Sequence, residues 1–86
     1  MRQFRWSREK NEQLKAERGV SFERLIDARF IGIEKHSSKP HQRLMIFEFR
    51  GYAWVVPYVE EKKAYFLKTA FPSRKHTKKY LKGGSG

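Results

Sequence analysis

The first quarter of the chain has the polar and apolar spacing of two helices. Ser7 is a good N-cap for a helix over residues 8–18, and Gly19 suits the position just after its last turn. This segment is so polar that it must lie on the surface, with Leu14 as one of its few apolar residues. Ser21 can begin a second helix. The buried face of that helix is predicted from helical spacing to comprise Phe22, Leu25 and Ile26.

From Phe30 onward the pattern changes to the alternation of β-strands. The predicted strands cover residues 30–33, 43–50, 52–59 and 64–71, with a polar loop at 34–42. Phe4 and Trp6 alternate with Arg5, which suits a short strand or an apolar anchor near the N-terminus. The strands are joined by short connections, so an antiparallel meander is expected.

The last predicted strand passes directly into a helix. Pro72 cannot donate to a sheet ladder, and Ser73 can cap a short cationic helix over residues 74–81. Backbone N–H groups and a partial positive charge gather at such a helix start. The predicted fold class is therefore α+β, with two N-terminal helices on one face of a three- to four-stranded antiparallel meander sheet and a short C-terminal helix.

Length and composition indicate one small domain. The 86 residues allow a single modest core, which we place in residues 1–82, and Gly83 to Gly86 is expected to be a flexible tail or appended linker. The chain has no cysteine, no apolar run of membrane-spanning length and no apolar stretch resembling a signal peptide near its N-terminus. A cytoplasmic setting is the expectation, without a membrane partner.

The charge is strongly positive and unevenly spread. The net charge is +11, and residues 62–86 contribute eight Lys or Arg side chains and no acidic one. Because single-sign charge on a small domain causes self-repulsion, this asymmetry indicates a polyanionic partner, either nucleic acid or an acidic protein segment. The alternative is a solvated helix that only keeps the protein soluble.

Both ends of the chain resemble BrnT-type toxins, small bacterial toxins of type II toxin–antitoxin pairs. The features at the N-terminal end are Phe4, Trp6, Lys10-Asn11 and the run Gly19-Val20-Ser21-Phe22-Glu23. The C-terminal segment FLKTAFPSRKHTKKYL, preceded by GYAWVVPYVEEKKAYFLKT over residues 51–69, looks like the family's closing strand and helix. The resemblance runs in register from Phe4 to Leu81.

The resemblance implies a RelE-like fold and a ribonuclease activity that blocks translation. It also implies a cognate antitoxin, expected to be a small DNA-binding protein with an acidic segment, and operator DNA bound only through the toxin–antitoxin complex. The chain departs from the family pattern where Ser7 replaces a common Asp and where Glu17-Arg18 replaces Lys-His. If that histidine takes part in chemistry within the family, Arg18 cannot do the same, so the identity of the base stays open.

The residues favour metal-free chemistry and no cofactor. A nuclease that depends on divalent metal needs several converging carboxylates, whereas acidic residues are scarce here and Glu34 falls among those interpreted as solvated or paired. His36 and His41 lie five positions apart in the polar loop without a third ligand nearby. RNA cleavage without metal needs a base for the ribose 2′-hydroxyl, a proton donor for the leaving oxygen and cations for the phosphate.

Five residues are candidates for these catalytic roles. Arg74 is the candidate for gripping the scissile phosphate, because guanidinium binds phosphate bidentately. Lys68 is a cation in an apolar strand, which either snorkels to an edge or lines a site. Tyr80 follows His76 at i+4, and either one could donate a proton or stack on a base. His41 and Glu48 are the candidate bases, although pairing of Glu48 with Arg50 or Lys68 is an equally good structural role.

A second group is predicted to track the RNA backbone. Its members are Lys75, Lys78, Lys79, Lys82, Arg43 and Arg50. Trp54, Tyr52 and Tyr58 alternate on one strand face and are predicted as core, with base-stacking platforms as the alternative. Three hypotheses are compatible with this sequence: an endoribonuclease toxin, a non-catalytic nucleic-acid-binding module or repressor, and a protein whose basic face receives an acidic partner segment.

Overall fold

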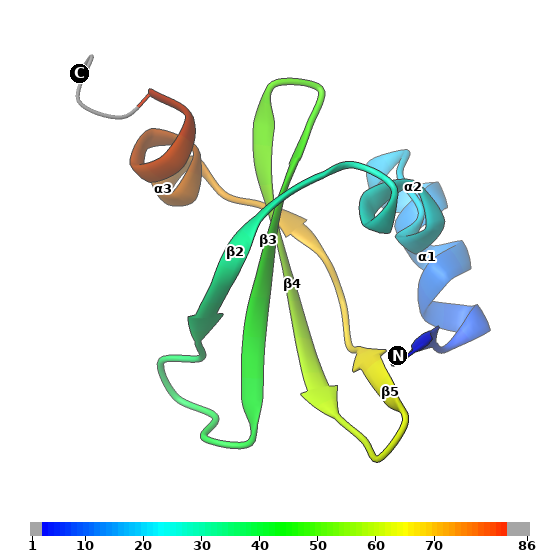
Figure 1. Cartoon of the computed structure of the whole chain (residues 1–86). Helices are drawn as coiled ribbons and strands as arrows, with labels where there is room; N and C mark the ends of the chain where they lie inside the picture. The colour runs from blue at the N-terminus through cyan, green and yellow to red at the C-terminus, as the bar shows by residue number, and fades with distance from the viewer. Residues whose placement is uncertain (1–2, 83–86) are drawn as a thin grey trace.

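A computed structural model describes residues 3–82, apart from the side chain of Lys82; the predicted tail at 83–86 lies outside the described residues. The elements follow in the order β1 (Gln3–Trp6), α1 (Arg8–Arg18), α2 (Phe22–Ile26), β2 (Arg29–Lys35), β3 (Gln42–Phe49), β4 (Tyr52–Glu60), β5 (Ala64–Leu67), β6 (Phe71–Pro72), α3 (Arg74–Thr77) and the π-helical turn η1 (Lys78–Lys82). The long hairpin of β3 and β4 lies at the centre of the sheet (Figure 1).

The prediction of a three- to four-stranded antiparallel meander is wrong. The structure has a mixed sheet of six strands with the order β1-β5-β4-β3-β2, and β6 pairs with β4 beside this path. The strand β1 pairs with β5 in parallel, so that Phe4 lies beside Tyr65. The strand β1 confirms the short strand offered as one alternative for Phe4 to Trp6, whereas the two-residue strand β6 was not predicted. Strands this short are fixed by tertiary pairing rather than by their own pattern.

Two strand boundaries were also predicted wrongly. The strand β2 continues through Glu34 to Lys35, which places Glu34 in the sheet instead of the loop. The last long strand ends at Leu67, and the N–H of Lys68 donates to the Pro57 carbonyl oxygen at 2.8 Å. The chain then crosses to the other side of the sheet before α3 begins (Figure 1).

The helix starts agree with the sequence. The hydroxyl oxygens of Ser7, Ser21 and Ser73 accept hydrogen bonds from the N–H groups of Lys10, Arg24 and His76 at 3.2, 3.2 and 3.1 Å. Gly19 ends α1 with a φ of 69°, which a residue without Cβ adopts readily. No helix within residues 3–82 has the length and apolar character needed to cross a membrane.

The helices cover both faces of the sheet, whereas the sequence placed them on one (Figure 1). The larger core joins α1 and α2 to one face and includes Leu14, Phe22, Leu25, Trp54 and Tyr58. The smaller core lies under α3 and η1 on the other face and comprises Ile46, Ala53 and Val55 with Ile31, Leu44, Phe71, Tyr80 and Leu81 against them. Alternate residues of β4 therefore contribute to the two cores.

Thr77 anchors helix α3 to the sheet. This residue is only 4% exposed. Its hydroxyl accepts a hydrogen bond from the Ala53 N–H at 2.9 Å and donates to the Ser73 carbonyl at 2.7 Å. One hydroxyl thus satisfies a backbone donor of β4 and holds the first turn of α3.

We expect Thr77→Val, which keeps the shape, to lower the free energy of unfolding by about 1–3 kcal/mol because the buried Ala53 N–H loses its acceptor. Urea unfolding followed by circular dichroism measures the change. Thr69→Val at a partly exposed position is the matched control and should change stability much less. Equal losses in the two variants would contradict the anchoring role of Thr77.

Candidate active site

The carboxylate of Glu34 connects β2 to the C-terminal helical segment. Glu34 pairs in register with Leu44, which packs in the core under α3. Its Oε1 lies 3.1 Å from His76 Nε2, and its Oε2 lies 3.0 Å from Lys79 Nζ. The Tyr80 hydroxyl donates to the same Oε2. We call these four residues the Glu34 cluster.

The electrostatics of this cluster keep Glu34 ionised. Burial by itself would raise the pKa of Glu34, but hydrogen bonds from Tyr80, Lys79 and His76 outweigh it and lower the pKa from 4.5 to about 2. The same contact with Glu34 raises the pKa of Lys79 and, together with burial, that of Tyr80. At neutral pH the carboxylate therefore accepts hydrogen bonds from three protonated groups.

The imidazole of His76 is held at both nitrogens. Nε2 faces the ionised Glu34, which can only accept, so this nitrogen carries a proton. Nδ1 lies 2.6 Å from Ser73 Oγ, and in the neutral imidazole it accepts the hydroxyl proton. The side chain of His76 is 12% exposed, and its ring stacks on Tyr80 at a centroid separation of 6.3 Å. An imidazole oriented by a carboxylate in this way can accept a proton at Nδ1, and Glu34 stabilises the resulting cation.

Three of the residues singled out from the sequence lie on this part of the fold. Tyr80 and Lys79 belong to the Glu34 cluster, although Lys79 was predicted to contact RNA and here pairs with a carboxylate. Arg74 is exposed in the first turn of α3, two residues before His76. The ionic and hydrogen bonds of the described residues give Arg74 no carboxylate partner, so its guanidinium faces solvent.

The other three catalytic candidates lie away from the cluster. Lys68 lines a groove beside α1 with Ser7 and Lys10, and its Nζ lies 5.5 Å from the Phe66 ring centroid. Glu48 pairs across the sheet with Arg29 at 2.5 Å, and His41 is exposed in the turn before β3. None of the five best-formed pockets among the described residues is lined by both Lys68 and Arg74, and the catalytic assignments from the sequence stay predictions.

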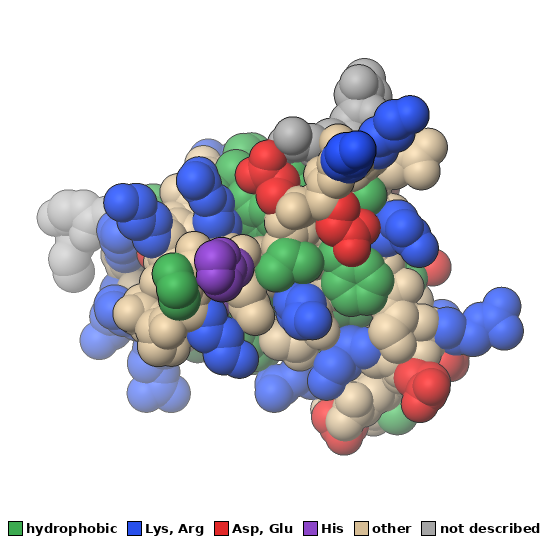
Figure 2. Space-filling view, turned by 90° about the horizontal axis from the view of Figure 1, so that it is seen from below, with side chains coloured by type: hydrophobic (Ala, Val, Ile, Leu, Met, Phe, Trp, Pro, Cys, Tyr) green, Lys and Arg blue, Asp and Glu red, His purple; other side chains and the backbone are tan. Residues whose placement is uncertain are grey.

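The residues predicted to bind RNA are spread over several surfaces. Lys75 and Lys78 are exposed on the C-terminal helical segment, Arg43 is exposed on β3, and Arg50 lies in the turn after β3. The side chain of Lys82 lies outside the described part of the chain. Figure 2 shows that Lys and Arg side chains predominate over Asp and Glu on the end of the molecule that it presents.

Sequence reasoning missed Glu34 and left His76 as a secondary candidate. The sequence pattern places Glu34 among solvated or paired charges near a helix or in a loop, whereas Glu34 lies in β2. A strand extended by two residues would have put Glu34 on the face of Gly32, beneath the final helix. The pairing of Glu34 with His76 spans 42 residues, and no local pattern carries it.

The fold of this chain has a counterpart among solved structures. The crystal structure of BrnT, the ribonuclease toxin of Brucella abortus, has a similar fold, with a TM-score of 0.57 and 18% identity over 85% of this chain and 97% of that chain. The sequence resemblance to BrnT-type toxins is thereby confirmed at the level of the fold. No family model and no curated protein matches the sequence.

Proposed function

We propose that this protein is an endoribonuclease toxin that cleaves RNA without a metal ion and so inhibits translation. The observation that carries the proposal is the hydrogen-bonded series from Ser73 Oγ to His76 and from His76 to the ionised Glu34. In this series the imidazole of His76 is an oriented proton acceptor, and it lies on a helical segment that also carries exposed cations. The likeness of the fold to BrnT, itself a ribonuclease toxin, supports the same activity.

In this proposal His76 is the general base. A ribose 2′-hydroxyl takes the place of the Ser73 hydroxyl beside Nδ1 and gives its proton to that nitrogen. The 2′-oxygen attacks the adjacent phosphorus, the bond from phosphorus to O5′ breaks, and the products are a 2′,3′-cyclic phosphate and a free 5′-hydroxyl. Glu34 stabilises the charged imidazole while the bond to phosphorus forms.

In this proposal the Tyr80 hydroxyl gives up its hydrogen bond to Glu34, turns to O5′ and donates the proton that this oxygen needs on leaving. Its hydroxyl stays protonated at neutral pH because Glu34 accepts its hydrogen bond and raises its pKa. Solvent afterwards removes the proton from His76 and restores the one on Tyr80. The exposed guanidinium of Arg74 grips the scissile phosphate, and Lys75 and Lys78 bind the flanking backbone. The cluster has one carboxylate, which suits proton transfer better than binding of a divalent metal.

The order Ser73–His76–Glu34 is also that of a hydrolytic triad, in which Ser73 would be the nucleophile. Ser73→Ala separates the two mechanisms. If the ribose attacks, the variant keeps its cleavage activity and loses about 1 kcal/mol of stability with its N-cap. If Ser73 attacks, activity disappears.

The function is tested with purified protein and a defined RNA in excess EDTA. We expect cleavage to continue in EDTA and every new 3′ end to carry a 2′,3′-cyclic phosphate, as shown by mass spectrometry of the fragments. An RNA with a single 2′-deoxy at the cleaved position should be uncut there. Binding with a steep salt dependence but no cleavage would favour a non-catalytic nucleic-acid-binding module instead.

A toxin of this kind needs a neutralising partner. The proposed partner is a cognate antitoxin, a small DNA-binding protein whose acidic segment lies on the basic C-terminal helix, in a bacterial cytoplasm. The pair would bind operator DNA through the antitoxin. Growth arrest on expression, relieved by expression of the neighbouring reading frame, tests this part.

A further inference from the structure

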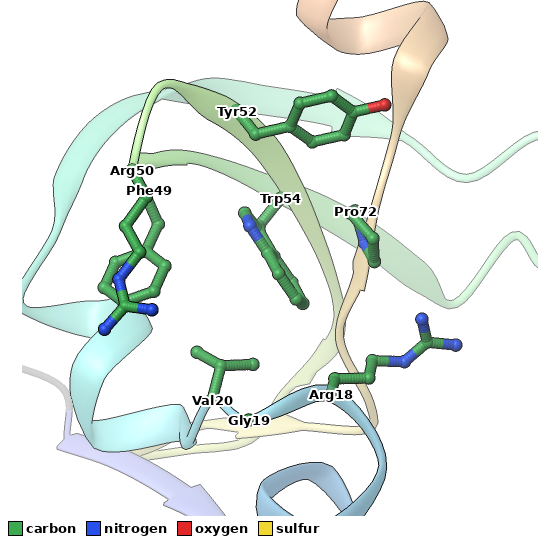
Figure 3. Close-up of a pocket in the computed structure, with 8 residues that line it drawn as sticks. All are labelled: Arg18, Gly19, Val20, Phe49, Arg50, Tyr52, Trp54 and Pro72. Atoms are coloured by element: carbon green, nitrogen blue, oxygen red, sulfur yellow. The ribbon is translucent and has the colours of Figure 1, made fainter.

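A separate pocket of about 300 Å³ opens where the first turn after α1 meets the β3–β4 hairpin. Its apolar lining includes Val20, Phe49, Tyr52 and Trp54. Figure 3 shows Arg18 and Arg50 on opposite sides of the pocket, with the Trp54 indole between them. No acidic residue is among the described residues that line it.

The polar groups at this pocket are hydrogen-bond donors without protein acceptors. Neither guanidinium has a carboxylate or hydrogen-bond partner among the described residues, and Arg50 instead lies 5.0 Å from the Phe49 ring centroid. The Trp54 indole N–H likewise has no acceptor within residues 3–82, and its nitrogen is open to solvent rather than buried. Two cations, an indole donor and aromatic walls favour a flat aromatic ligand that carries an anion.

We propose that this pocket binds one nucleobase of the RNA substrate and that Arg18 and Arg50 bind its flanking phosphates. This inference rests on the proposed function. The volume is at the small end of ligand pockets and suits one base better than a peptide segment. Pro72 lines the pocket (Figure 3). It immediately precedes Ser73, which contacts His76, so adjacent residues connect the pocket to the Glu34 cluster.

The backbone at Arg50 gives an independent reason to assign it a role. Arg50 and Gly51 form the two-residue turn between β3 and β4 with φ values of 56° and 77°. Two positive φ values are typical of a type I′ turn, which favours Asn-Gly. Arginine is a costly residue in this left-handed conformation, and such strain is typical of functional positions.

The test uses Arg50→Asn, which relieves the strain and removes the guanidinium. Its affinity for an RNA protected by one 2′-deoxy at the cleaved position is measured by fluorescence anisotropy. We expect about tenfold weaker binding together with a melting temperature raised by several degrees. The control is Lys62→Ala on the exposed β4–β5 connection, which removes one charge far from the pocket lining.

The base is tested by placing an abasic nucleotide at each position of the same RNA in turn. One position should weaken binding by the wild type about 5- to 150-fold, and its effect on Arg50→Asn should be smaller because that variant no longer holds the flanking phosphate that places the base in the pocket. Equal losses in Arg50→Asn and Lys62→Ala, or no sensitive position, would overturn the proposal. So would tight binding of an acidic aromatic peptide, sensitive to Arg50→Asn, with no such effect on RNA. Because the RNA is uncleavable, failure here leaves the proposed cleavage untouched, and failure of cleavage leaves this binding measurable.

Discussion

Replacement of His76 by alanine is expected to lower the single-turnover rate of RNA cleavage by about 10²- to 10⁴-fold, the range for loss of a general base. The fold should persist, because Ser73 keeps its place as N-cap, Thr77 still holds α3 to β4, and Glu34 keeps Lys79 and Tyr80 as partners. Quenched-flow or gel assays under enzyme excess give the rate, and circular dichroism gives the fold.

Chemical rescue distinguishes a base from a structural residue. Added imidazole should restore part of the activity of His76→Ala, with a dependence on its neutral form, whereas a residue needed only for packing gains nothing. His41→Ala is the informative comparison, because the sequence offered His41 as a base and the structure leaves it exposed in a turn. Loss of cleavage in His41→Ala with full activity in His76→Ala would contradict the role of His76 as the base.

The features predicted correctly from the sequence are those set by local chemistry. A serine before a helical segment can satisfy a free N–H within three residues, so the starts at Ser7, Ser21 and Ser73 were visible directly. The alternation of aromatic residues along β4 identified part of the core, because alternate side chains of a strand lie on the same face. The spacing of His76 and Tyr80 put both on one helix face, and their rings do stack.

The features that were missed depend on contacts between distant segments. A short strand at Phe4 to Trp6 is one of the two alternatives that the sequence offers, and β1 confirms it, but its parallel pairing with β5 joins positions about 60 residues apart and was missed. Helices cover both faces because the chain crosses from one side of the sheet to the other after Leu67. No pattern in the sequence marks this crossing. The same limitation hid Glu34, because a carboxylate at the end of a strand acquires meaning when a helix more than 40 residues later packs over it.

The site residues chosen from the sequence illustrate this division. Arg74 and Tyr80 were chosen from their place in the final helix, and the structure locates both on the segment that carries His76. Lys68 and Glu48 were chosen from strand alternation, which gives a face but no neighbour. Their neighbours are the groove beside α1 and the side chain of Arg29.

Glu34 makes the cluster a source of acid-sensitive stability. Its pKa is about 2 in the folded protein and 4.5 as an ordinary carboxyl, so the unfolded chain binds its proton first as the pH falls. The stability from ionised Glu34 is therefore complete above about pH 5 and is lost progressively between pH 5 and pH 2. At roughly 1.4 kcal/mol for each pH unit between the two values, the contribution at neutral pH is on the order of 3 kcal/mol.

Glu34→Gln should consequently be less stable than the wild type by about 2–3 kcal/mol at pH 7, and the difference should shrink toward zero near pH 2. Urea unfolding of both proteins at a series of pH values measures it. Glu12→Gln is the matched control, because Glu12 forms an exposed pair with Lys15 on α1 and such pairs contribute about 0–1 kcal/mol. Parallel pH curves for Glu34→Gln and the wild type below pH 5 would show that the carboxylate is not held ionised. In that case Glu34 could neither fix the proton on His76 Nε2 nor stabilise the charged imidazole, and the proposed base would lose its support.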